Sequence, residues 1–210
     1  MFDARLIRWR DALVGPALGL VMLFGGVSAG AATVQVQVND AAGKPLAEAV
    51  VFLESREAQA AVKPVLGTEI AQVTKQFTPK VVVVPVGSAV SFPNRDTVRH
   101  HVYSFSPAKT FELKLYVGTP TTPVVFTKSG IAVLGCNIHD NMAAWIVIVE
   151  TPYYGRSAEP GRVTLLNVPP GNYRLRIWHP ALPVGGPPSD QALVVGGDAT
   201  VSVRLAGVSA

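Results

Sequence analysis

The chain has 210 residues, of which 49% are hydrophobic and 15% charged, and its formal net charge is +4. This composition excludes a disordered chain, because such chains are poor in apolar residues. The basic residues form no Lys/Arg block, so nucleic acid is not expected as a partner. The single cysteine, Cys136, excludes an intramolecular disulfide. The 19 Gly and 17 Pro, together with abundant Val, favour an all-β protein with many turns.

Residues 1–32 have the pattern of a secretory signal peptide. Three arginines within the first ten residues precede an apolar segment, 12–27, and the small residues of 28–32 follow it. We predict cleavage after Ala31 or Ala32 and a mature protein in a bacterial periplasm. The alternative is an uncleaved membrane anchor, although the apolar segment is short for a span of about 20 residues. Contact with a membrane is expected only in that case.

From residue 33 onward the hydrophobic pattern has a period of two. Residues 33–38 alternate strictly between Val and polar residues, which predicts a strand with one buried face. A turn signal at 39–43 and a second strand at 49–53 follow, whereas 57–62 is compatible with a helical turn or a loop. Further strands are predicted at 80–85, 89–92, 100–106, 111–116, 123–127, 132–135, 143–150, 162–167, 173–178, 192–195 and 200–205. About a dozen short strands without a long amphipathic helix are typical of β-sandwiches.

The segments 38–50 and 161–175 together resemble the transthyretin-like, or carboxypeptidase-regulatory, sandwich. In the second segment, Pro170 should fix φ and Gly171 should supply a positive φ, which predicts a sharp turn. About a hundred residues separate segments that are close in sequence in that family. We therefore predict a signal peptide at 1–32, a transthyretin-like sandwich formed by 33–67 and 151–210, and a second sandwich, 68–150, inserted in it. Two sequential domains remain the alternative.

The inserted segment contains the candidate metal-ligating residues. It includes Cys136-Asn-Ile-His139-Asp-Asn-Met142 and, upstream, His100 and His101. One thiolate, two imidazoles and a thioether suit a trigonal copper site with a weak axial methionine. Zinc is the competing metal, but a methionine ligand argues against it. Apolar strands flank the Cys-to-Met segment, so these three candidates should lie on one turn at a pole of the sandwich.

The order of these residues resembles that of the cupredoxins, the type 1 blue copper proteins. The short Cys-x2-His-x2-Met spacing is similar to that of amicyanin, within a family that also includes plastocyanin. Neighbouring residues of a strand face opposite sides, so His100 and His101 can hardly bind one ion together. The register of Phe92 and Asn94 in the family pattern selects His100. The resemblance implies one mononuclear type 1 copper with His100, Cys136, His139 and an axial Met142 as ligands.

Two departures from the family pattern affect the expected reduction potential. Cupredoxins often have Asn after the first ligand histidine, where this chain has His101. In the family that Asn links the two ligand loops, a role that the ring nitrogens of His101 could also fill. The residue before the second histidine is often Pro, and here it is Ile138.

With its flanking segments, the chain resembles exported cupredoxin-containing proteins of the methylamine-utilisation type. The resemblance implies a periplasmic carrier of single electrons between Cu(I) and Cu(II), whose partner is a redox protein or a dehydrogenase. We predict no enzymatic activity, because the sequence has no second histidine cluster for a catalytic copper. We also expect no small-molecule substrate. Two alternatives remain: a copper-binding module for delivery, storage or sensing, and a cell-envelope interaction module with a structural copper. The fourth histidine, His179, is expected to pack or hydrogen-bond locally.

Overall fold

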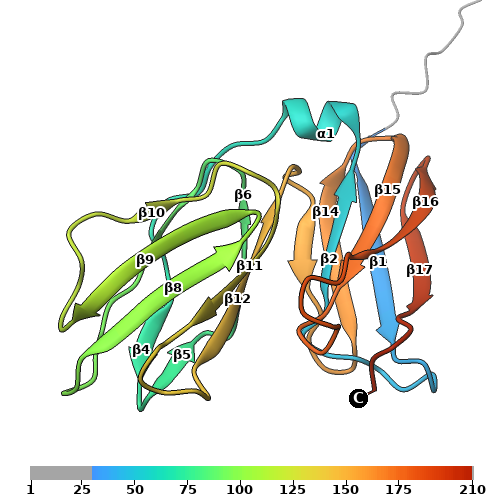
Figure 1. Ribbon diagram of the computed structural model, residues 1–210. Coiled ribbons are helices and arrows are strands. Elements are labelled where there is room, and N and C mark those ends of the chain that lie inside the picture. The colour runs from blue at the N-terminus through green and yellow to red at the C-terminus, as the bar shows by residue number, and fades with distance from the viewer. Residues whose placement is uncertain (1–29, 210) are drawn as a thin grey trace, which may run out of the picture.

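The computed structural model describes residues 30–209, and these are nearly all β, as predicted. The predicted signal peptide, residues 1–32, lies almost entirely outside the described residues. Within the described part, no helix is long and apolar enough to cross a membrane. Figure 1 shows two β bodies side by side, with the short helix α1 (Arg56–Ala60) above the junction.

Both ends of the described chain contribute to the first sandwich. One sheet has the order β14-β1-β17 and the other the order β13-β2-β15-β16. In β1, Val34, Val36 and Val38 are at most 1% exposed while the intervening glutamines face outward, which confirms the predicted alternation. The strands are β1 (Ala32–Asn39), β2 (Val50–Glu54), β13 (Tyr154–Arg156), β14 (Arg162–Val168), β15 (Gly171–Trp178), β16 (Ser189–Val195) and β17 (Ala199–Arg204).

The predicted turn at Pro170–Gly171 is wrong in its geometry. Gly171 has no positive φ and is the first residue of β15, whereas Asn167, near the end of β14, has φ 57°. Asparagine tolerates this left-handed conformation. The sharp reversal is not needed, because β14 and β15 belong to different sheets and the segment between them crosses from one layer to the other.

The second sandwich is formed by residues 68–149. Its main sheet has the order β6-β12-β11-β8-β9, and it faces a small sheet, β10-β7-β3, and the hairpin β4-β5. Phe77, Phe92, Phe126 and Leu134 are among the side chains that fill its core. The strands are β3 (Thr68–Glu69), β4 (Ala71–Val73), β5 (Gln76–Thr78), β6 (Val81–Pro85), β7 (Ala89–Ser91), β8 (His100–Ser106), β9 (Lys109–Tyr116), β10 (Val124–Val125), β11 (Gly130–Gly135) and β12 (Ala143–Val149).

A third apolar cluster joins the two sandwiches. It combines Phe52 and Trp178 of the first sandwich with Val81, Val147 and Val149 of the second. The Trp178 ring lies 6.3 Å from that of Trp145, measured between centroids. β12 is therefore buried on both faces, which explains its nearly continuous apolar sequence. The domain boundaries that we placed at residues 67/68 and 150/151 stay a prediction.

Candidate metal centre

Three of the predicted ligands converge at one end of the second sandwich. The candidate ligand atoms of His100, Cys136 and His139 all lie within 4.8 Å of one another. Cys136 Sγ is 4.0 Å from His100 Nδ1 and 3.9 Å from His139 Nδ1. His100 is fully buried and Cys136 is 4% exposed, while His139 is half-buried. One sulfur and two imidazole nitrogens thus surround a common point.

Strand pairing explains how residues distant in sequence meet here. Cys136 directly follows β11, and His139 lies on the loop that connects β11 to β12. Gly135 pairs with Ala143 of β12 on one side and with Tyr103 of β8 on the other. This places the loop beside the start of β8, where His100 is the first residue.

The fourth predicted ligand, Met142, closes the same loop. Its backbone N–H donates to the carbonyl of His139 at 3.0 Å. The side chain is 2% exposed and packs in the same core cluster as Cys136. Its thioether is therefore buried in the same core as the Cys136 sulfur.

His101 does not belong to the converging group. It is buried, and its ring lies 5.5 Å from that of Tyr103, between centroids. Its Nε2 lies 2.9 Å from a carboxylate oxygen of Glu112 on β9, without the alignment of a hydrogen bond. His101 therefore faces β9, and among the described residues its side chain makes no hydrogen bond, ion pair or ring contact with the Cys136–Met142 loop.

The structure adds Asp96, which sequence reasoning missed. Its Oδ2 lies 2.8 Å from His100 Nε2, the ring nitrogen directed away from Cys136. Burial by itself would raise the pKa of Asp96, but hydrogen bonds from the Lys75 N–H, from His100 and from the Thr74 N–H outweigh it and lower the pKa. The lowered pKa favours the ionised carboxylate, which can accept a hydrogen bond from a protonated Nε2 of His100. Ligand histidines are commonly oriented in this way.

Asn94, noted in the sequence only for its register, holds the loop that carries Asp96. Its Nδ2 donates to the carbonyls of Val98 and Tyr116, at 2.8 and 2.9 Å. Its Oδ1 accepts from the Asp96 N–H at 2.9 Å, an Asx turn. Because both ends of the amide are hydrogen-bonded, the loop that leads from Asn94 to His100 has a defined conformation without a metal.

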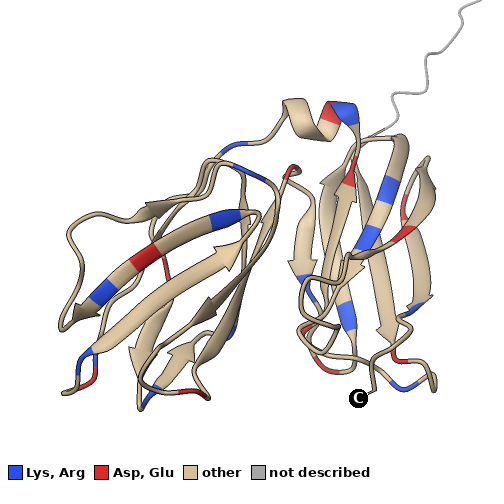
Figure 2. Cartoon of the chain, viewed as in Figure 1, with Lys and Arg blue, Asp and Glu red and all other residues tan. Residues whose placement is uncertain are grey.

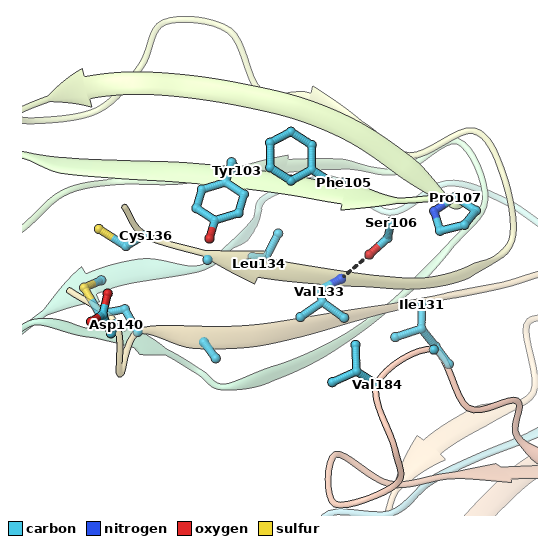
Figure 3. Close-up of a pocket in the computed structure, with 14 residues that line it drawn as sticks. Tyr103, Phe105, Ser106, Pro107, Ile131, Val133, Leu134, Cys136, Asp140 and Val184 are labelled. Atoms are coloured by element: carbon cyan, nitrogen blue, oxygen red, sulfur yellow. Dashed lines mark hydrogen bonds between the residues drawn. The ribbon is translucent and has the colours of Figure 1, made fainter. Parts of the chain in front are cut away.

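A cleft of about 570 Å³ opens beside Cys136. Figure 3 shows Tyr103 and Phe105 of β8 along one side, with Val184 of the first sandwich near the far end. The Tyr103 ring packs on Gly135: a Cβ on this glycine would lie 2.6 Å from Tyr103 Cζ. The residue before Cys136 must therefore be small.

We predict that Gly135→Ala lowers the free energy of unfolding by about 1–3 kcal/mol, because the Tyr103 ring must move to admit the methyl group. Chemical denaturation measures this loss. Gly196→Ala is the matched control, since nothing lies within 4 Å of an added Cβ there. Equal stability of the two variants would contradict this prediction and show that the Tyr103 ring moves aside without loss of packing.

Strand β9, whose Tyr116 end pairs with His100, carries charges of both signs along its length. Figure 2 shows basic and acidic positions alternating along β9, the strand that contains Lys109, Glu112 and Lys114. The remaining histidine, His179, is held locally: its Nε2 lies 3.1 Å from the carbonyl of Ala47, and its Nδ1 accepts from the Ala181 N–H.

No family model and no curated protein matches the sequence. Among solved structures, the chain is similar to a purple cupredoxin from Nitrosopumilus maritimus, with 19% identity, a TM-score of 0.35, and coverage of 40% of this chain and 100% of that one. It is also similar to a mutant of amicyanin in the Cu(I) form, with 19% identity, a TM-score of 0.36, and coverage of 47% and 98%. A third similar structure is a copper-containing nitrite reductase from Thermus scotoductus, with 23% identity and a TM-score of 0.38. The match covers 54% of this chain and 28% of the reductase.

Proposed function

We propose that the site holds one mononuclear type 1 copper ion, bound by His100, Cys136 and His139 with Met142 as the weak axial ligand. The observation that carries this proposal is the convergence of a buried cysteine with the Nδ1 atoms of two histidines. A buried thiolate without a cation is costly. Two imidazoles, a thiolate and a thioether are the donor set that suits copper, whereas structural zinc takes four strong ligands.

Neighbouring residues hold the four proposed donor groups in position, which suits a metal ion that changes its charge. Cys136 and Met142 close a tight loop between two core strands, and Asp96 orients His100 from behind. Bound there, copper would supply reversible one-electron chemistry between Cu(I) and Cu(II). Donors held by a β scaffold need to move little between these two states, which favours electron transfer over metal exchange.

The function we propose is that of a periplasmic electron carrier, not an enzyme, which exchanges single electrons with a redox protein or a dehydrogenase. The periplasmic location is supported by the signal-like sequence of residues 1–32. His139 is only partly buried, so a partner could approach the centre at this residue. The sandwich formed by both chain ends is proposed to be transthyretin-like, on the sequence pattern of 38–50 and 161–175, in an exported protein of the methylamine-utilisation type.

Redox cycling of the protein without its first 31 residues, loaded with one equivalent of Cu(II), tests this function. We expect an intense visible absorption that ascorbate bleaches and ferricyanide restores over repeated cycles, with the copper retained after gel filtration. Loss of Cu(I) to an equimolar chelator during reduction would contradict electron transfer and favour copper delivery or storage. Cycling also separates the carrier from an interaction module whose copper is only structural.

A further inference from the structure

The hairpin β4-β5 has an unusual turn. Its strands pair from Ala71 with Thr78 to Val73 with Gln76, which leaves only Thr74 and Lys75 to reverse the chain. Both residues have positive φ, 52° and 58°. Two-residue turns of this kind normally contain Asn and Gly, because other residues are strained there. Such a conformation persists where its surroundings hold it in place.

Asp96 is the group that holds the turn. Its Oδ1 accepts the Thr74 N–H at 2.6 Å, and its Oδ2 accepts the Lys75 N–H at 2.8 Å. The same Oδ2 lies 2.8 Å from His100 Nε2. One carboxylate therefore connects the tip of the hairpin to the first candidate ligand, and two backbone N–H donors fix its orientation.

Backbone hydrogen bonds attach the hairpin to the loop that carries Asp96. The Gln72 N–H donates to the Pro93 carbonyl and the Arg95 N–H donates to the Gln72 carbonyl, both at 2.9 Å. The Gln72 side chain is fully buried, and its Oε1 lies 2.9 Å from the Tyr116 hydroxyl. The turn, the loop and Asp96 thus form one connected unit at the back of the metal centre.

We propose that the Thr74–Lys75 turn is a positioning element of the centre, which locks the Asp96 carboxylate so that His100 carries its proton on Nε2 and directs a free Nδ1 lone pair at Cys136. A neutral histidine has one N–H, and the acceptor beside it decides which nitrogen bears it. With Asp96 released, His100 can also take the Nδ1-protonated form, in which an N–H blocks the direction of ligation. The expected effect on copper affinity rests on the proposed function. The tautomer of His100 does not, because it can be measured in the copper-free protein.

Nitrogen-15 NMR of the copper-free protein tests the role of the carboxylate. We expect a single Nε2-protonated form of His100 in the parent and a mixture of tautomers in Asp96→Asn, with Cu(II) affinity lower by about 10–100-fold. Asp198→Asn is the matched control, because this carboxylate also accepts a backbone N–H, from Thr33, but in the other sandwich. An unchanged tautomer in Asp96→Asn would overturn the proposal.

Two changes of the turn separate its role from that of Asp96 alone. One glycine inserted between Thr74 and Lys75 should disrupt the paired donors and reproduce the mixed tautomers, whereas one inserted between Gly196 and Gly197 should not. The double change Thr74→Asn with Lys75→Gly keeps both N–H groups and should keep the parent tautomer, provided that the amide spectrum shows a folded chain. A parent-like tautomer after the Thr74–Lys75 insertion would overturn the role of the turn.

The same measurements distinguish this inference from the proposed function. A locked tautomer in a protein that binds no copper would contradict the copper function and leave the positioning role intact. Mixed tautomers in a parent protein that cycles copper reversibly would contradict the positioning role and support the copper function.

Discussion

Cys136→Ser is expected to abolish the intense visible absorption of the copper-loaded protein. The absorption of a type 1 site arises from charge transfer between thiolate and Cu(II), and Cys136 is the only cysteine in the chain. A serine hydroxyl remains protonated at neutral pH and is a poor ligand for copper. Loss of a residue that only hydrogen-bonds a metal ligand typically lowers metal affinity about 10–100-fold. Because Cys136 is proposed to bind copper directly, we expect a larger fall in copper affinity. Absorption and competition titrations with a chelator measure both effects.

Met142→Leu is the control for this experiment. It removes the proposed axial ligand but keeps the volume of a side chain that is 2% exposed. We expect the absorption to persist with a changed reduction potential. Because serine in the position of Cys136 buries a hydroxyl, at a cost of about 1–3 kcal/mol, near-UV circular dichroism must first show that the variant is folded. A weak spectrum that is identical in the parent and in folded Cys136→Ser would mean that the thiolate does not bind copper.

Trp178→Ala is expected to lower the free energy of unfolding by about 3–5 kcal/mol, the usual cost of removing a buried aromatic side chain. Trp178 is 3% exposed and lies in the cluster shared by the two sandwiches, next to Trp145. The variant leaves a cavity where β15 meets β12, so both sandwiches lose packing. Urea denaturation followed by circular dichroism measures the loss.

Phe105→Ala is the matched aromatic control for the interface. Phe105 is 74% exposed, so its removal should change stability by no more than about 0.5 kcal/mol. If Trp178→Ala were as stable as Phe105→Ala, the two sandwiches would not share a core. A Trp178→Ala protein that denatures in two separate steps would support the shared core, because it would show that this cluster couples the unfolding of the two sandwiches.

The local sequence pattern was sufficient to predict strands that have one face in a core and the other in solvent. In β1 the alternation of valine with polar residues follows directly from a period-two backbone with one buried face. The hairpin β4-β5 was missed because each strand has three residues and the turn, Thr74–Lys75, lacks the Gly or Asn that signals a positive φ. The positive φ expected at Gly171 was wrong because a Pro-Gly pair does not reveal whether the chain reverses within a sheet or crosses to another.

For the candidate site, the sequence by itself determined that a thiol, an imidazole and a thioether share one short loop, because Cys136, His139 and Met142 are separated by only two residues each. Only the tertiary structure decided what faces that loop. It brings His100 to within 4.0 Å of the Cys136 sulfur, turns His101 toward β9, and places Asp96 and the Thr74–Lys75 turn behind His100. The reason is physical: spacing along the chain determines contacts within a turn, whereas contacts between distant residues depend on strand register, which is set by the packing of the whole sandwich.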